Sequence, residues 1–291
     1  MCIAFSGIFY LFAAVSPSTG VFYRAVFGLP LLVLVAFGEW RRHGPLPRSS
    51  VRLAAIAGVF FAGDLLFWHH AIEAVGAGLA TVLGNLQVII VGFFAWMLLG
   101  ERPSRAALLA LPVVLSGVIL IAGVVGDDAY GAAPQLGVIL GVATAFCYSA
   151  YLLIIRRGGR DQRRPAGPVA IATFVVAICS LVIGGAGGDL DLTPPLHSVF
   201  WLAMLGITSQ SAGYLLISIS LPRLPAIITS IILLSQPVMS MGLAIVLVGE
   251  APSTTQLLGV VLVIGGIAAA TVPVARLRDS LQRARLSPKN P

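Results

Sequence analysis

Charged side chains are scarce in this 291-residue sequence, at 10% of all residues, whereas apolar side chains make up 58%. A typical soluble domain has about 25% charged and about 45–50% apolar residues. With a mean hydropathy of +0.99, a chain of this length cannot bury its apolar side chains in one soluble core. The proportions exclude an ordinary soluble protein and predict an all-α integral membrane protein.

Cysteine is also rare, and Cys2, Cys147 and Cys179 all lie in apolar stretches. Neither a disulfide framework nor a metal site is indicated, because no ligand partners occur at useful spacing. The Gly-x-x-x-x-Gly-Lys pattern of a phosphate-binding loop is missing too, so ATP-driven work by this chain is not supported. We therefore expect neither a metal nor a cofactor.

Long polar segments are lacking as well, and apolar segments follow one another with short connections. A bilayer-spanning helix needs roughly 20 mainly apolar residues, and turn-forming residues such as Pro194-Pro195 separate the segments. The first segment is short, so it either packs against its neighbours or is completed by residues upstream of Met1. The ten expected spans are residues 2–15, 21–37, 52–74, 77–98, 104–124, 135–156, 168–186, 197–219, 225–248 and 254–275.

The net charge of +7 comes from arginine-rich connections between spans and does not indicate nucleic-acid binding. Cytoplasmic loops of membrane proteins carry an excess of Lys and Arg. With ten spans, every lysine and arginine except Arg24 falls on one side, and the opposite connections carry Asp127, Asp128, Asp189 and Asp191. We therefore expect both termini to be cytoplasmic.

An internal repeat joins the two halves of the chain. Residues 77–117 fall on residues 226–266 at an offset of 149 without a gap, so that Gly100-Glu101 meets Gly249-Glu250. Chance matches of Gly, Ala and Leu are the alternative, but Pro103-Ser104 also meets Pro252-Ser253. Since five spans separate the copies, the halves have opposite orientation, as in carriers that alternate access around a midplane site. We predict a five-plus-five inverted repeat of transmembrane helices, with five-helix units at 1–126 and 134–275 and a basic cytoplasmic tail at 276–291.

The second copy contains a run of motif residues, which are Ser235-Gln236-Pro237, Gly249-Glu250, Pro252-Ser253, Gln256, Gly259 and Gly265-Gly266. This run resembles the signature of the drug/metabolite transporter superfamily, and within it the EamA-type exporters, which have ten spans in two inverted halves. The first copy departs from the pattern, with Val88 in place of the proline, Ala107 of the glutamine and Ala110 of the glycine. The resemblance implies a secondary transporter in a bacterial inner membrane, and the cluster Trp68-His69-His70 is similar to exporters of aromatic amino acids.

Asp64 is the strongest candidate site residue, since it lies near the middle of an apolar span. A carboxylate at membrane depth costs about 2.5–3.5 kcal/mol on insertion scales, and such residues are usually functional or paired. Asp64 is either a proton-coupling or substrate-ammonium site, or a structural acid. Trp68 shares its helix face one turn away.

Other ionisable residues have two interpretations each. His69, His70 and Glu73 are either a pH-sensing or proton-relay group or an interfacial polar collar. Arg24, His70 and Glu73 are candidate carboxylate or gate contacts. Arg24 either binds a substrate carboxylate, or pairs with an outer acid such as Glu73, or extends to the interface.

Polar residues within the spans predict a central cavity, with interhelical hydrogen bonding as the alternative for each one. Pro237 predicts a kink or hinge. The expected cavity residues are Asp64, Trp68, His69, Asn85, Gln87, Tyr148, Tyr151, Ser209, Gln210, Tyr214, Ser235 and Gln236.

The leading hypothesis is export of small metabolites, with amino acids and particularly aromatic ones favoured, by alternating access around that cavity. Its expected partners are a small-molecule substrate, the lipid bilayer and, if flux is coupled, protons; the oligomeric state is left open. The alternatives are export of other metabolites or drugs, a membrane-embedded enzyme, and a receptor or scaffold.

Overall fold

The computed structural model describes residues 2–99, 105–124, 128–158, 163–220 and 226–271. Every regular element in these ranges is a helix, so the expected all-α class is confirmed for them. The predicted tail at 276–291, Glu101, Arg102 and Arg223 lie outside the described residues.

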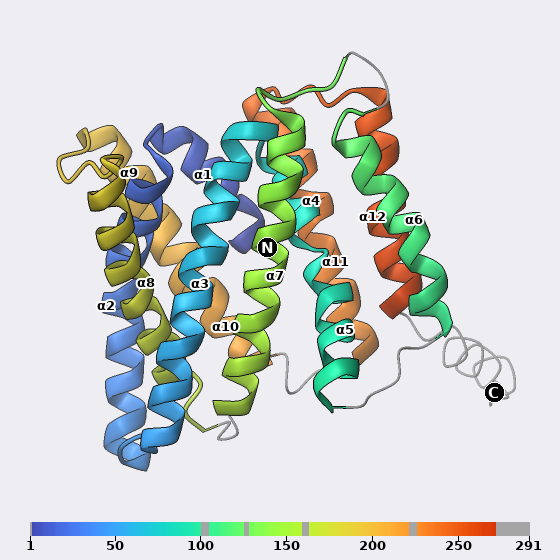
Figure 1. Ribbon diagram of the computed structural model, residues 1–291. Helices are drawn as coiled ribbons and strands as arrows, with labels where there is room; N and C mark the ends of the chain where they lie inside the picture. Colours follow the sequence, from blue (N-terminus) through green and yellow to red (C-terminus); the bar gives the residue numbers. More distant parts are fainter. Residues whose placement is uncertain (1, 100–104, 125–127, 159–162, 221–225, 272–291) are drawn as a thin grey trace, which may run out of the picture.

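Short breaks divide the chain into the helices labelled in Figure 1. Element η1 is a 3₁₀-helix, whereas η2 and η4 are π-helices. In chain order the elements are η1 (Cys2–Phe5), α1 (Ser6–Ala13), α2 (Pro17–His43), α3 (Arg48–Val75), α4 (Ala77–Gly84), α5 (Gln87–Leu99), α6 (Arg105–Ile121), α7 (Pro134–Gly158), α8 (Ala166–Gly187), α9 (Leu196–Met204), η2 (Leu205–Gly213), α10 (Tyr214–Ser220), α11 (Ala226–Leu243), η4 (Ala244–Val248) and α12 (Thr254–Thr271).

Six helical segments of the described chain are long and apolar enough to cross a membrane, and four shorter apolar helices accompany them. The shorter ones cover residues 3–13, 106–121, 235–248 and 254–270. Each of these segments overlaps one of the expected spans. That all of them cross the bilayer stays a prediction.

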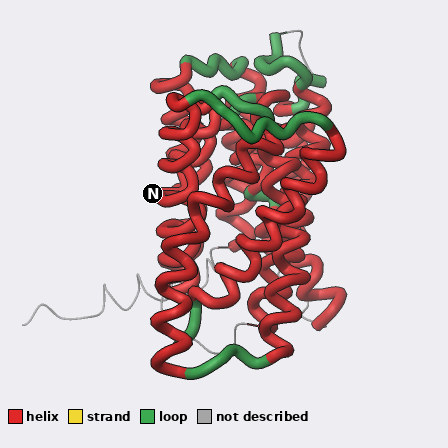
Figure 2. The backbone as a smooth tube through the Cα atoms, turned by 90° about the vertical axis from the view of Figure 1, so that its left-hand side faces the viewer, coloured by secondary structure: helices red, strands yellow, loops and turns green. Residues whose placement is uncertain are grey.

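The long helices run roughly parallel, and the loops gather at the two ends of the bundle (Figure 2). The connection from α2 to α3 and the one from α7 to α8 lie at the same end, where Arg164 Nη1 donates hydrogen bonds to the carbonyl oxygens of Gly44 and Pro45 at 3.2 and 2.6 Å. At the opposite end the Ser16 hydroxyl donates to the backbone oxygen of Asp189. The described arginine-rich connections therefore share one end and the described acidic ones the other.

Helices from the two predicted halves pack side by side, as α3 with α7, α2 with α8, and α6 with α12. Small residues allow the closest approach: a Cβ on Gly117 or Gly259 would lie 2.6 Å from the carbonyl oxygen of the other residue. Lipid tails are as apolar as leucine, so such close packing is what holds membrane helices together.

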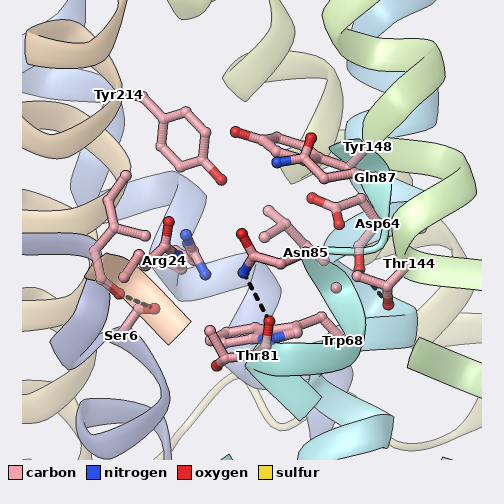
Figure 3. Close-up of a pocket in the computed structure, with 14 residues that line it drawn as sticks. Ser6, Arg24, Asp64, Trp68, Thr81, Asn85, Gln87, Thr144, Tyr148 and Tyr214 are labelled. Atoms are coloured by element: carbon pink, nitrogen blue, oxygen red, sulfur yellow. Dashed lines mark hydrogen bonds between the residues drawn. The ribbon is translucent and has the colours of Figure 1, made fainter. Parts of the chain in front are cut away.

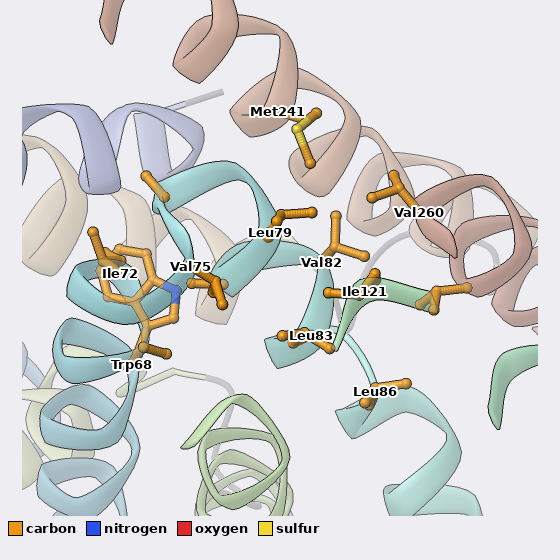
Figure 4. Packing of buried hydrophobic residues seen from close by; sticks show 14 of the residues in the cluster. Trp68, Ile72, Val75, Leu79, Val82, Leu83, Leu86, Ile121, Met241 and Val260 are labelled. Carbon is orange, nitrogen blue, oxygen red and sulfur yellow. The ribbon is translucent and has the colours of Figure 1, made fainter. Parts of the chain in front are cut away.

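A buried apolar cluster joins α3, α4, α6, α11 and α12 (Figure 4). Val75 of α3, Leu79 and Leu83 of α4, and Ile121 of α6 are fully buried within it. Met241 of α11 also belongs to this cluster. The cluster fixes α4 in the middle of the bundle.

Four expected spans are not regular α-helices throughout: the one at 2–15 begins with the 3₁₀-helix Cys2–Phe5, the one at 225–248 ends in the π-helix Ala244–Val248, and two more are interrupted inside. The span predicted at 77–98 is broken, because α4 ends at Gly84 and α5 begins at Gln87, with Asn85 and Leu86 in a turn between them. The span predicted at 197–219 contains the π-helix Leu205–Gly213. Pro237 lies inside α11, which runs without a break from Ala226 to Leu243, so its role as a hinge stays a prediction.

Candidate functional site

A cavity lies in the middle of the bundle, with about 520 Å³ of space free of protein atoms, including its opening to solvent. Its wall combines side chains of η1, α1, α2, α3, α4, α5, α7, α10 and α11 with the turn between α4 and α5, as the close-up shows (Figure 3). The lining residues are Ile3, Ser6, Arg24, Asp64, Leu65, Trp68, Thr81, Gly84, Asn85, Gln87, Thr144, Tyr148, Tyr214 and Gln236.

Arg24 of α2 forms one side of this cavity and is only 1% exposed. Its Nε donates a hydrogen bond of 2.8 Å to Gln210 Oε1, and Gln210 Nε2 donates one of 3.0 Å to Thr173 Oγ1. The guanidinium carbon lies 5.7 Å from the ring centre of Trp68, within the range of a cation–π interaction. Arg24 therefore neither pairs with Glu73 nor extends to the membrane interface, and those two alternatives are wrong.

One nitrogen of Arg24 has no hydrogen-bond partner among the described residues. Its Nη1 is buried without a hydrogen-bond partner, and leaving a buried donor unpaired costs free energy. The guanidinium is thus held by Gln210 through Nε, by the Trp68 ring and by the Tyr214 hydroxyl, while Nη1 is free to donate.

Asp64 of α3 lies on the opposite side of the cavity from Arg24 (Figure 3) and is 6% exposed. The two charged groups are not within the 4.0 Å of a direct ion pair. Gln87, at the start of α5, is labelled next to Asp64 in the same view, and its Oε1 is buried without a hydrogen-bond partner.

Aromatic rings border the cavity on two sides. Tyr148 and Tyr214 line it, and behind them Tyr151 stacks on Tyr148 and Phe61 with ring centres 5.7 and 4.5 Å apart. Trp68 lies across the cavity from the two tyrosines (Figure 3). The cavity thus offers two opposite charges between aromatic surfaces.

The break between α4 and α5 brings polar groups to the cavity. Asn85 in the turn donates a hydrogen bond of 2.8 Å from Nδ2 to the Thr81 carbonyl oxygen, which partly replaces the helical bonds lost at the break. Discontinuous helices are a recurring way of building substrate sites in transporters.

The cavity gathers many of the predicted site residues, together with Arg24, which was predicted as a carboxylate or gate contact. Those that line it are Asp64, Trp68, Asn85, Gln87, Tyr148, Tyr214 and Gln236.

The other predicted cavity residues do not line it. The His69 ring lies against Tyr10 with ring centres 4.3 Å apart, and its Nδ1 is 2.7 Å from the Leu65 carbonyl oxygen. Tyr151 and Gln210 support lining residues from behind. Ser209 is buried in the π-helix and Ser235 is exposed on α11.

His70 and Glu73 are exposed on α3, 3.9 Å apart. Glu73 Oε1 accepts a hydrogen bond of 3.1 Å from the Tyr10 hydroxyl. This arrangement resembles the polar collar rather than part of the cavity wall, and a gating role stays a prediction.

Sequence reasoning did not find Ser6, Thr81 and Thr144 among the lining residues. Short hydroxyl side chains in apolar helices usually bond to their own backbone, as Thr81 does to Ala77 at 2.7 Å, so their type carries little information. In the part of the chain that the structure describes, no three His, Cys, Asp or Glu side chains come together as metal ligands.

The sequence matches the EamA-like transporter family over residues 1–123 and 135–272. The chain belongs to this family, which is part of the drug/metabolite transporter superfamily, and it is a multi-pass membrane transporter. The expectation taken from the motif run of the second repeat is confirmed at the level of the family.

Several relatives have similar lengths. An uncharacterized protein of Pseudomonas aeruginosa is 26% identical over 244 residues, which are 83% of this chain and 80% of the relative. An uncharacterized transporter of Synechocystis is 25% identical over 259 residues, 84% of this chain and 76% of the relative. A protein of known crystal structure has a TM-score of 0.61 at 21% identity, covering 93% of this chain and 98% of its own, which shows a shared fold.

Proposed function

We propose that this transporter is a secondary carrier that exports amino acids, aromatic ones in particular, by alternating access. One observation carries the proposal: a buried cavity holds a guanidinium and a carboxylate on opposite sides, between aromatic rings. A free amino acid needs both charges, and an aromatic side chain gains from ring contacts.

The mechanism is supported by the repeat and by the helix arrangement. Residues 77–117 and 226–266 correspond at an offset of 149, and the bundle has long and short apolar segments that overlap ten expected spans. Two inverted five-helix units at 1–126 and 134–275 would rock around the midplane cavity, exposing Arg24 and Asp64 first to one side and then to the other.

Buried charges make a purely apolar substrate a poor occupant of this cavity, because a desolvated charge without a partner is costly. Export of amphipathic drugs or of other metabolites with two opposite charges is the alternative within the family. The test must therefore compare amino acids with compounds that carry one charge or none.

The test uses the purified full-length chain in liposomes. Labelled phenylalanine, tyrosine and tryptophan are expected to move down their gradients faster than in empty liposomes. They should also move faster than labelled lysine or glutamate, because Arg24 and Asp64 pair with the two backbone charges and leave no partner among the described residues of the cavity wall for a charged side chain. Liposomes no leakier than empty ones across a panel of amino acids would overturn the proposal.

A further inference from the structure

Among the residues that the structure describes, two buried polar atoms of the cavity lining lack hydrogen-bond partners, and their chemistry is opposite. Arg24 Nη1 is a donor and Gln87 Oε1 is an acceptor. Nearly all buried polar atoms in proteins are paired, and unpaired ones call for an explanation. Both atoms belong to lining residues, so a molecule in the cavity is the natural partner of each.

The unpaired donor belongs to a positive side chain and the unpaired acceptor lies beside a negative one. Arg24 and Asp64 face each other across the cavity, and Gln87 lies on the side of Asp64 (Figure 3). A carboxylate accepts hydrogen bonds only, whereas an ammonium group donates three. Each end of the cavity is therefore complementary to one end of a zwitterion and repels the other.

We propose that Arg24 binds the carboxylate of the substrate through Nη1, and that Asp64 and Gln87 Oε1 together bind its ammonium group, which fixes one orientation of the amino acid in the cavity. This inference rests on the proposed function and adds which residues bind each charged group of the amino acid. It predicts selection for a molecule that carries both charges, independently of its side chain.

Gln210 is a positioning residue in this scheme. It lies behind Arg24, fully buried, and holds Nε at 2.8 Å while Thr173 Oγ1 holds its amide nitrogen at 3.0 Å. The π-helix Leu205–Gly213 presses Gln210 against α2, since a Cβ on Gly28 would lie 2.9 Å from Gln210 Cγ. With Nε bonded to Gln210, Nη1 is the buried nitrogen of Arg24 that has no partner among the described residues and can donate to the ligand.

The experiment measures how well three compounds compete with labelled phenylalanine for transport into liposomes. They are phenylalanine itself, phenethylamine, which lacks the carboxylate, and 3-phenylpropionate, which lacks the ammonium group. In the wild-type protein both analogues are expected to compete at least about tenfold more weakly than phenylalanine, since each loses one charge-assisted contact.

Variants then show which residue binds which charged group of the substrate. Arg24→Gln is expected to abolish the preference for phenylalanine over phenethylamine, while the preference over 3-phenylpropionate remains. Asp64→Asn should abolish the preference over 3-phenylpropionate, while the preference over phenethylamine remains.

Gln210→Ala should weaken only the preference over phenethylamine and should raise the half-saturation concentration for phenylalanine. Arg24→Lys should keep part of the preference over phenethylamine because the charge remains. Ser180→Ala is the matched control: Ser180 is buried in α8, away from the cavity lining, and its hydroxyl donates to the α8 carbonyl oxygens of Val176 and Ala177 at 2.8 and 3.2 Å.

If a variant transports too slowly, the same preferences are measured as ligand-induced shifts in melting temperature of the purified protein. Wild-type transport of amino acids with preferences unchanged in Arg24→Gln and Asp64→Asn would overturn this inference and leave the proposed function standing. No transport and no melting shift with any amino acid in the wild type would overturn both.

Discussion

Among the described residues that line the cavity, Asp64 is the only acid. A carrier that exchanges substrate for protons needs a group in its cavity that takes up and releases a proton. In general an arginine side chain stays charged in proteins, and a tyrosine hydroxyl gives up its proton only well above neutral pH. Proton coupling through the cavity wall therefore depends on Asp64.

We predict that Asp64→Asn abolishes the pH dependence of phenylalanine flux. The amide cannot exchange a proton, so flux driven by a concentration gradient should be the same at pH 6 and pH 8. The measurement compares initial rates in liposomes at both pH values, with Ser180→Ala as the folded control. A pH dependence as large as that of the wild-type protein would assign Asp64 to binding alone.

At the scale of elements, helix ends from the two predicted halves are joined by glutamates. Glu250 follows η4 and accepts hydrogen bonds from the backbone N–H groups of Ala77 and Gly78, at 2.5 and 3.1 Å, at the start of α4. A negative charge at a helix N-terminus is favourable because the first N–H groups lack partners within the helix. This contact ties the connection before α12 to the broken helix that carries the cavity residues.

Glycine makes room for this contact. A Cβ on Gly76, which has a φ of +87°, would lie 2.7 Å from the Glu250 carboxyl carbon. At the other end of the bundle Glu39 of α2 accepts from the N–H groups of Ala166 and Gly167 at the start of α8, at 3.0–3.1 Å.

Burial raises the pKa of Glu250, and the hydrogen bonds from Ala77 and Gly78 oppose this shift without cancelling it. The folded protein then binds this proton more readily than the unfolded chain. The contribution to stability is therefore complete below the ordinary glutamate pKa and is lost as the pH rises through the folded-state pKa.

We predict that the wild-type protein gains stability relative to Glu250→Gln as the pH falls from 7.5 towards 5, because the glutamine variant cannot take up the proton. The measurement is the difference in melting temperature between the two proteins in detergent at each pH. A difference that moves in the opposite direction on acidification would mean that the hydrogen bonds at α4 outweigh burial.

For the whole molecule, the distribution of charge between the two ends predicts its orientation. The described arginines of the α2–α3 and α7–α8 connections share one end, and Asp189 and Asp191 lie at the other, next to Ser16 and Thr19. Basic loops are retained in the cytoplasm, so the end with the arginines should face inwards.

We predict that a cysteine at Ser49, near the start of α3, reacts with a membrane-impermeant thiol reagent only in inside-out vesicles. A cysteine at Leu192, in the connection between α8 and α9 at the other end of the bundle, should react only in intact cells. Both positions are exposed, and Cys2, Cys147 and Cys179 are first replaced by serine. Labelling of the two positions from the same side would exclude this topology.

Several features of this protein followed from the sequence alone. The helical membrane class, the positions of the apolar segments and the family depend on local composition and on motif residues such as Gly249-Glu250. The free energy of inserting a helix into a bilayer is close to the sum of the contributions of its own residues, so the sequence of each segment is enough to predict it. Asp64, Gln87 and Tyr148 were found because polar groups at membrane depth stand out against an apolar background.

Only the tertiary structure decided which polar residues share a cavity. His69 is next to Trp68 in the sequence, yet it lies against Tyr10, whereas Ser6 and Thr144 reach the cavity from α1 and α7. The break at Asn85 and the π-helix around Gln210 were not predicted either. Polar residues occur in both runs, but a polar residue within a span does not show where the helix geometry changes. Rotation and register of helices are set by contacts between residues far apart in the chain, such as Arg24 with Gln210 or Glu250 with Ala77. Those contacts form only when the helices have packed together in the membrane.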